Sequence, residues 1–367
     1  MMRRTFLDSA AAVTFAPAAF AAGGATGKPD GTGNFFVPEE SQPHLRTFMQ
    51  WPVNRTVHPD RHFLGALQET IADIANTIAE FEPVVMMMPP EHEISARKML
   101  GAAVEIWTVP TDDLWCRDSG PLFVTDGEGG LAVCQLNFNG WGNRQVHDND
   151  GLVAQRVAER LGLSVIDSGV VGEGGGIETD GEGTLLAHES SWVNPNRNSI
   201  SKQEIERRLL DAFGAEKMIW APGIAGADIT DYHIDSLARF VAPGSVLIQL
   251  PETIDPDDPW SAAAFETYDI LRGATDSAGR SLELTVVPEP VDIRVEDDEF
   301  VASYANYYVC NGAVIAAQFG DSETDSEAER LLRQFYPGRE IVMLDVDPVG
   351  EIGGGIHCAT QQQPLVS

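Results

Sequence analysis

A cysteine near the C-terminus lies in a setting suited to nucleophilic chemistry. Cys358 comes shortly after three consecutive glycines, Gly353 to Gly355. Glycine lets the backbone approach a ligand closely or adopt positive φ, so a cysteine just beyond such a turn can face a cleft. A thiolate presented there is a competent nucleophile. Because most lone cysteines are small buried hydrophobes, Cys358 needs partners before chemistry can be assigned to it.

A histidine and a carboxylate stand two residues apart in the segment Asp231-Tyr232-His233-Ile234-Asp235. If the segment is a strand, alternate residues point to the same face, and His233 and Asp235 lie side by side. Histidine carries protons near neutral pH, and a carboxylate binds cations. A lone histidine is usually structural, and the pairing makes a functional role as well supported as a structural one.

Two further segments offer groups that bind a planar cation. The face of Trp115 can stack on such a cation, and Asp118 can hold it through charge-assisted hydrogen bonds. The alternative is a structural ion pair between Arg117 and Asp118. Glu173, on a glycine-rich turn, adds another carboxylate. Cysteine, histidine, carboxylates and tryptophan together suit cleavage of a guanidinium C–N bond, because this delocalised cation is a poor electrophile and a rigid fork of donors.

The charge balance bears on the partner. The 367 residues include 24 Lys and Arg against 56 Asp and Glu, a formal net charge of −32. Nucleic acid is therefore excluded as a partner, since phosphates need basic surface, whereas a small cationic substrate would be attracted. An acidic shell that keeps the protein soluble is an equally good explanation.

The cysteines indicate neither a metal site nor a disulfide scaffold. Cys116, Cys134, Cys310 and Cys358 are isolated, without a CxxC pair. The sequence does not decide whether any of them form a disulfide. Asp148 to Gly151 matches only a fragment of a calcium loop, and we predict a surface turn there.

The N-terminus predicts export. Arg3 and Arg4 precede a small apolar stretch, Ala10 to Phe20, so residues 1–22 are typical of a twin-arginine signal, too short and alanine-rich for a membrane span. Residues 23–34 would be a flexible linker, and 35–367 the folded domain. The mature protein, without a membrane span, would be periplasmic or secreted, or cytoplasmic if the signal is not functional.

Short apolar runs alternate with helical patterns along the body of the chain, which predicts a single α/β domain. The expected strands are 83–88, 104–110, 131–138, 163–168, 246–250, 282–288 and 312–317, and the expected helices are 64–81, 91–100, 151–161, 201–213, 259–273 and 322–335. The glycine-rich run 172–177 reappears at 350–356, which hints at duplicated units around a pseudo-symmetry axis.

The order of several motifs resembles the agmatine deiminase and bacterial peptidylarginine deiminase family. The runs are WCRDSGP, NFNGWGN, EGGGI, DGEGT, NPNRN, YHID, SYANYYV, QFGD and GGGIHCATQQQP, and the landmarks extend from Trp51 to Pro364. The resemblance implies a pentein fold, a five-bladed α/β propeller with pseudo-fivefold symmetry in a single domain. Such a fold would account for the repeated glycine run.

The resemblance also implies roles for the site residues. Cys358 matches the nucleophile and His233 the general acid/base, while Asp118 and Asp235 match the guanidinium-binding carboxylates. Glu173 and Trp115 match residues that line the same pocket. The implied reaction is hydrolysis of agmatine to N-carbamoylputrescine and ammonia through a covalent thiouronium on the cysteine. No metal or organic cofactor is expected, and homologous enzymes imply a homodimer.

Two departures leave the substrate open. Glu178 stands where relatives carry His, and Cys116 occupies a small apolar position beside Asp118. A protein-arginine deiminase that forms citrulline is the nearest alternative, and an amidinotransferase would use the same intermediate with an amine acceptor. A more distant alternative is an exported polyamine-binding protein. A metallohydrolase lacks the expected ligand spacing.

Overall fold

A computed structural model describes residues 35–295, 297 and 299–366. The predicted export signal (1–22) and linker (23–34) lie outside the described residues. The chain from Asn34 to Ser367 forms one compact unit. Within the described ranges, no helix is both long enough and apolar enough to cross a membrane.

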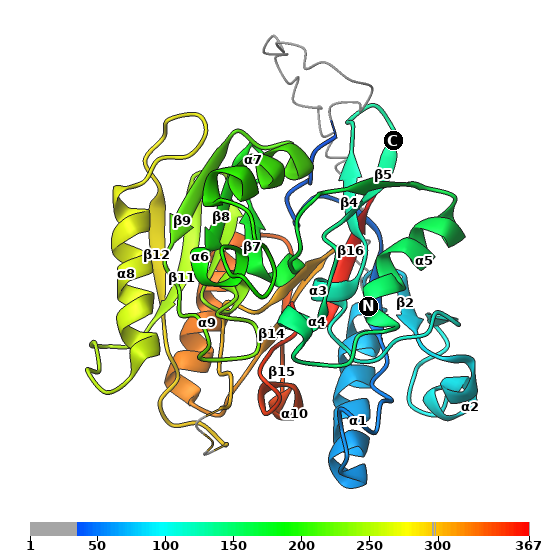
Figure 1. Cartoon of the computed structure of the whole chain (residues 1–367). Helices are drawn as coiled ribbons and strands as arrows, with labels where there is room; N and C mark the ends of the chain where they lie inside the picture. The colour runs from blue at the N-terminus through cyan, green and yellow to red at the C-terminus, as the bar shows by residue number, and fades with distance from the viewer. Residues whose placement is uncertain (1–34, 296, 298, 367) are drawn as a thin grey trace, which may run out of the picture. The chain divides into compact units, whose positions relative to one another are not determined.

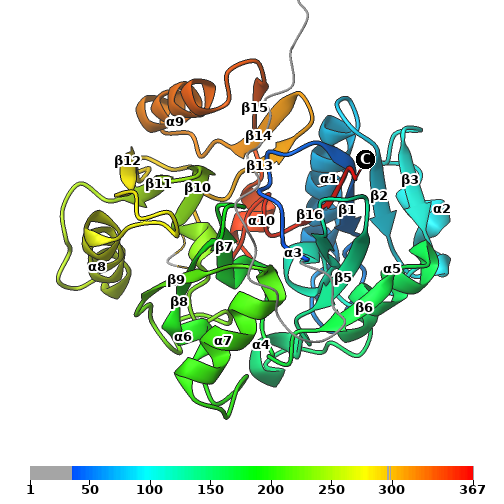
Figure 2. The ribbon, with the colours of Figure 1, turned by 90° about the horizontal axis from the view of Figure 1, so that it is seen from above.

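Five β-sheets follow one another around a common centre in chain order (Figure 2). Four of them have three strands, in which the first two are antiparallel and the third runs parallel to the second. These sheets are β4 (Leu122–Thr125), β5 (Leu131–Gln135), β6 (Ser164–Asp167); β7 (Ile177–Thr179), β8 (Thr184–His188), β9 (Lys217–Ala221); β10 (Ala238–Ala242), β11 (Ser245–Leu250), β12 (Glu283–Pro288); and β13 (Tyr308–Cys310), β14 (Ala313–Ala317), β15 (Glu340–Leu344). The predicted single-domain α/β fold is confirmed.

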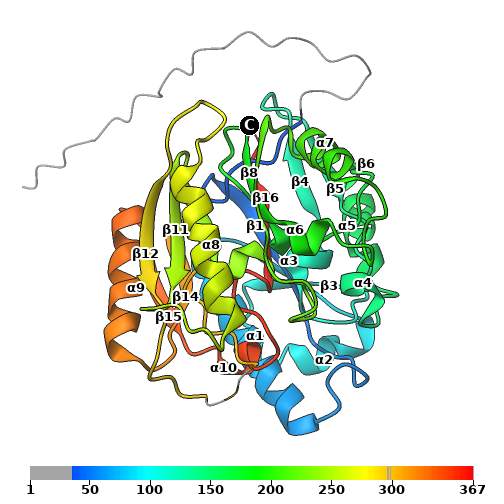
Figure 3. The same cartoon turned by 60° about the vertical axis from the view of Figure 1, so that its left-hand side comes forward.

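The fifth sheet joins the two ends of the described chain. Its order is β16 (Thr360–Pro364), β1 (His44–Gln50), β2 (Val84–Met87) and β3 (Val104–Trp107). β16 is antiparallel to β1, with Met49 opposite Thr360 and Phe48 opposite Gln361. Figures 2 and 3 show this pairing as red β16 beside blue β1, and Figure 1 shows β16 as a red strand. The last strand thus acts as the first strand of a unit that β1 and β2 continue.

A helix crosses over before the third strand of each unit, as parallel neighbours require. These helices are α1 (Arg61–Ile78), α5 (Val153–Leu161), α7 (Lys202–Phe213), α8 (Pro259–Gly273) and α9 (Ser322–Phe335). Asp60, Ser201, Asp258 and Asp321 cap the first turns of α1, α7, α8 and α9 by accepting backbone N–H bonds. Figures 2 and 3 show α8 and α9 on the outer side of their sheets.

Shorter helical segments lie between these elements. They are η1 (Pro90–His92), α2 (Glu93–Ala96), α3 (Cys116–Ser119), α4 (Gly140–Asn143), η2 (Asp150–Leu152), η3 (Gly174–Gly176), α6 (Glu189–Trp192), η4 (Ile234–Ser236) and α10 (Asp347–Gly350), where η marks a 3₁₀ turn. Of these, α10 lies near the centre of the ring in Figure 2.

Two predictions of helix and strand were wrong. The helix expected over 91–100 is reduced to η1 and α2, and Ile94 there is 82% exposed, so the segment has little apolar surface to bury. The segment 231–235 is not a strand, because Asp231 and Tyr232 have φ of 60° and 70° and a 3₁₀ turn begins at Ile234. The Asp231 carboxylate holds this turn by accepting a hydrogen bond from the Gly226 amide.

Candidate active site

Each of the five sheets contributes the segment that immediately precedes its first strand. Trp115 and α3 precede β4, and Glu173 with η3 precedes β7. His233 and η4 precede β10, Asn306 precedes β13, and Cys358 precedes β16. Equivalent points of successive units meet at the centre of a ring, and hydrogen bonds join these segments, including Gly175 N to Asp118 Oδ1 (3.0 Å). The two glycine runs singled out from the sequence therefore occupy equivalent positions, before β7 and before β16.

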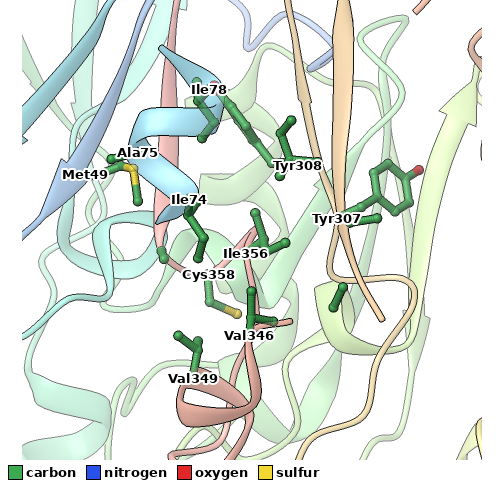
Figure 4. Close-up of a cluster of buried hydrophobic side chains, with 14 of the residues drawn as sticks. Met49, Ile74, Ala75, Ile78, Tyr307, Tyr308, Val346, Val349, Ile356 and Cys358 are labelled. Carbon is green, nitrogen blue, oxygen red and sulfur yellow. The ribbon is translucent and has the colours of Figure 1, made fainter. Parts of the chain in front are cut away.

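The Cys358 thiol lies at the edge of the largest hydrophobic cluster and among polar groups. Figure 4 shows it with Ile356, Val346 and Val349 of that cluster. Asn306 Nδ2 donates to its sulfur at 3.1 Å, and the thiol donates to Asp235 Oδ2 at 3.5 Å. Burial raises the pKa of the Cys358 thiol well above its usual value, and the nearby carboxylates add to this. The free protein therefore holds a neutral thiol at neutral pH.

His233 is enclosed by carboxylates. Its Nε2 lies 3.2 Å from Glu173 Oε2, and its Nδ1 lies 3.7 Å from Asp118 Oδ1. Burial favours the neutral ring, but these negative charges outweigh it and raise the pKa of His233 to about 9. The imidazole is therefore cationic at neutral pH and can act as a proton donor.

The two aspartates differ in how their oxygens are used. Both oxygens of Asp118 accept hydrogen bonds, one from Gly175 N and the other from Trp141 Nε1 at 2.9 Å. In Asp235, which is fully buried, Oδ2 bonds to His357 Nδ1 at 2.7 Å, whereas Oδ1 has no hydrogen-bond partner. A buried carboxylate oxygen without a donor is unfavourable by itself, so Oδ1 is suited to a donor from a bound cation.

Gly175 marks the point where these groups converge. A β-carbon placed on it would lie 2.8 Å from His233 Nδ1, 2.9 Å from Asp118 Oδ1 and 3.0 Å from Asp235 Oδ2. At the matching turn, a β-carbon on Gly354 would lie 2.4 Å from the Trp115 ring and 3.4 Å from Cys358 Cβ. Both runs need glycine because the functional side chains pack directly against the backbone.

Glu173 anchors the histidine within a buried ion network. Both of its oxygens accept from Arg197 Nε, at 2.8 and 2.9 Å, and Arg197 Nη1 donates to Asp231 Oδ2 at 2.6 Å. All three side chains are at most 1% exposed. The carboxylate charge is thus balanced before any ligand binds.

The structure brings together all six residues that the sequence analysis singled out. The sequence analysis did not identify their partners Asn306, Arg197 and His357. All three lie inside runs that carried the family resemblance, namely SYANYYV, NPNRN and GGGIHC. The runs therefore indicated that these segments matter, but they did not show which residue in each run contacts the site.

The two residues expected to depart from the family pattern, Glu178 and Cys116, have different surroundings. Glu178 pairs with Arg239, with 2.7 Å between Oε1 and Nε. Cys116 is completely buried. All four cysteines are free and buried. Burial also raises the pKa of the Cys134 thiol to about 12. Cys134 lies in a hydrophobic cluster and is a core residue.

The predicted surface turn at Asp148–Gly151 is wrong for its third residue. Asp150 is 2% exposed, and its carboxylate accepts the amide hydrogens of Asp112 (2.7 Å) and Asp113 (3.0 Å). These bonds fix the loop that leads into Trp115. No group of His, Cys, Asp or Glu side chains in the described part of the chain is arranged to hold a metal ion.

Comparison with known proteins gives concordant matches. The profile of the Porphyromonas-type peptidyl-arginine deiminase family matches residues 36–364. A Streptomyces coelicolor protein provisionally named agmatine deiminase is 39% identical over 339 residues, which cover 90% of this chain and 99% of that protein. The structure of the agmatine deiminase of Enterococcus faecalis superposes with a TM-score of 0.80 at 30% identity, covering 90% and 96% of the two chains. A substrate-bound variant of the agmatine deiminase from C. jejuni has a TM-score of 0.78 at 25% identity, with 90% and 96% covered.

Proposed function

Because the chain belongs to the Porphyromonas-type peptidyl-arginine deiminase family, we propose that it hydrolyses agmatine to N-carbamoylputrescine and ammonia. The observation that carries this proposal is the convergence of His233, Asp118 and Asp235 on Gly175, with the Cys358 thiol bonded to Asp235. A cationic acid, two carboxylates and a thiol are the groups that hydrolysis of a guanidinium C–N bond needs.

Binding of the guanidinium would activate the nucleophile. The carboxylates of Asp235 and Asp118 raise the pKa of the Cys358 thiol in the free protein, in addition to the larger effect of burial. A guanidinium bound to these carboxylates offsets their charge and adds its own positive charge beside the sulfur, so both effects lower the thiol pKa. Asn306 Nδ2, at 3.1 Å from the sulfur, further favours the thiolate. The substrate thereby helps to create the anion that attacks it.

In the first half of the reaction, the Cys358 sulfur bonds to the guanidinium carbon. The C–N bond to one terminal nitrogen then breaks, and His233 gives that nitrogen its proton, so that ammonia leaves. A thiouronium remains covalently attached to the sulfur. Asp118 and Asp235 hold the remaining nitrogens and keep the carbon in place.

In the second half, water attacks the thiouronium carbon and His233, now neutral, takes up a proton from it. The C–S bond breaks, the hydroxyl of the adduct gives its proton to the sulfur, and the ureido product leaves. The net change converts the guanidinium cation and one water into the neutral ureido product, one ammonia and one proton. That proton is the one that the Cys358 thiol releases to solvent when the guanidinium binds.

Two observations support agmatine among the guanidines. Relatives over nearly the whole chain carry the agmatine deiminase name, and a net charge of −32 favours a substrate with two positive charges. Deimination of a peptide arginine remains the second candidate, supported by the family description. Export and dimerisation stay predictions from the sequence.

The test is ammonia release by the purified protein with agmatine, free arginine or an arginine peptide. We expect release from agmatine, and Cys358→Ala should lower kcat by about 10⁴-fold or more because the covalent route is lost. Cys134→Ala is the matched control and should keep its activity, while a thiol-alkylating reagent but not a chelator should inactivate the wild type. Turnover of the peptide alone would reassign the substrate, and no turnover of any of the three by folded protein would refute deimination.

A further inference from the structure

His357, the residue before the candidate nucleophile, bridges two carboxylates. Its Nδ1 lies 2.7 Å from Asp235 Oδ2, and its Nε2 lies 3.0 Å from Glu40 Oε2. The side chain is almost fully buried. A neutral imidazole has one N–H, whereas the imidazolium donates from both nitrogens. The two contacts together therefore fit a cationic ring that donates one hydrogen bond to each carboxylate.

Glu40 gives the ring a fixed support. Its Oε2 also accepts from Arg117 Nη2 at 3.0 Å and pairs with Arg239 Nη2 at 3.2 Å. Its Oε1 accepts the amide hydrogen of Val309 at 2.9 Å. Although burial opposes the charge, the neighbouring cations hold the pKa of the Glu40 carboxyl well below its usual range. A charged carboxylate held by this many donors cannot turn away from the ring.

The consequence appears at Asp235. Its Oδ2 receives the His357 bond and faces the Cys358 thiol, and its Oδ1 is the buried oxygen without a partner. The two oxygens of a carboxylate are equivalent, so a half-turn about the terminal bond of the side chain changes nothing. A partial turn moves both oxygens away from their partners, and this torsion is broad for aspartate. The hydrogen bond from His357 fixes the plane of the carboxylate.

We propose that His357 is a positioning residue, which orients the Asp235 carboxylate so that Oδ1 stays open to the guanidinium of the substrate. This inference rests on the proposed function. It assigns His357 no proton transfer and no contact with the substrate. Loss of the ring would leave Oδ2 without its short bond and free the carboxylate to turn, while the charges of the site other than its own would remain.

Two near-isosteric variants separate this role from a merely structural one. In His357→Asn, the amide nitrogen can take the place of Nδ1 and still donate to Asp235, but it cannot reach Glu40. In His357→Gln, the longer amide reaches toward Glu40 in the place of Nε2 and loses the bond to Asp235. Kinetics with agmatine should therefore show His357→Asn within about tenfold of wild-type kcat, and His357→Gln and His357→Ala lower by about 100-fold, the cost of a misplaced group. KM should rise most in His357→Ala.

The controls address folding and the proposed function separately. His58→Ala removes another buried histidine that bonds to an aspartate, with 2.8 Å from its Nε2 to Asp113 Oδ1, and should lower Tm while kcat stays within about threefold. If His357→Ala does not fold, the ranking of the Asn and Gln variants decides. A ranking in which Gln retains more activity than Asn, or an active His357→Ala, would overturn the positioning role alone. A folded wild type that is silent on agmatine would overturn the proposed function and this inference with it.

Discussion

The substitution Gly175→Ala tests the convergence of the site without changing any charge. A β-carbon there would lie 2.8 Å from His233 Nδ1, 2.9 Å from Asp118 Oδ1 and 3.0 Å from Asp235 Oδ2, whereas ordinary van der Waals contact begins near 3.4 Å. All three groups would have to retreat by about 0.5 Å, in different directions. Gly175 does not have positive φ, so the backbone itself tolerates alanine.

The expected effect follows from those distances. Overpacking by one methyl costs about 1–3 kcal/mol of stability, and displacement of catalytic groups by a fraction of an ångström to 1 Å lowers the rate by up to about 100-fold. We therefore expect kcat/KM for agmatine to fall by about 100-fold in a variant that still folds. Ammonia release and thermal unfolding, measured on the same preparation, check both parts.

A matched control makes the same chemical change elsewhere. A β-carbon on Gly65, within α1, would meet no atom within 4 Å. Gly65→Ala should keep wild-type kinetics and gain up to about 1 kcal/mol of stability from helix propensity. If folded Gly175→Ala kept kcat/KM within about threefold of wild type, the convergence on Gly175 would not be the reacting centre.

Two predictions concern stability. Because the pKa of His233 is raised from 6.5 to about 9, its charged form stabilises the fold fully below pH 6.5, and this contribution, about 3 kcal/mol, is lost as pH rises through 9. Denaturant unfolding at pH 6 and pH 10 should show the gap between wild type and His233→Asn shrinking by that amount, and a pH-independent gap would contradict the charge assignment. Arg197→Met removes the cation that buried Glu173 and Asp231 share. Because His233 and Arg144 still pair with these carboxylates, the cost should lie near the lower end of about 3–5 kcal/mol. Arg207→Met, at an exposed pair, should leave the free energy of unfolding almost unchanged. Equal losses in the two arginine variants would refute the special place of the buried network.

Local signals explain which elements could be predicted from the sequence. The helices α8 and α9 occupy the predicted ranges, Pro259–Gly273 and Ser322–Phe335, because each begins after a capping aspartate, Asp258 or Asp321. Short strands such as β9 and β13 lack a comparable signal, and the pairing of β16 with β1 joins segments more than 300 residues apart. No local pattern carries such a contact.

In the site, too, motifs identified residues, but no local pattern predicted which of them come together. Its six predicted residues were reached through motifs and the family resemblance, and not through any local pattern that would bring positions 118, 233 and 358 together. Asn306 and His357 act on Asp235 from 71 and 122 residues away. The strand expected at 231–235 was wrong, but the two positive φ angles and the 3₁₀ turn still deliver His233 and Asp235 to the same place. Ring closure, which depends on the whole chain, supplies what local periodicity cannot.

The charge of His233 favours an enzyme over a polyamine-binding protein. A protein that only captured a cation would gain from free carboxylates, and a buried imidazolium between Asp118 and Glu173 would weaken the binding by repelling the ligand. That repulsion is useful only if His233 transfers its proton, as it does when a C–N bond breaks and the nitrogen must leave as neutral ammonia. After the transfer the ring is neutral, and the bound thiouronium retains its carboxylate partners. The proton transfer that releases ammonia therefore also removes the repulsion between the ring and the intermediate. The same neutral ring can then take a proton from water, which links the two halves of the reaction.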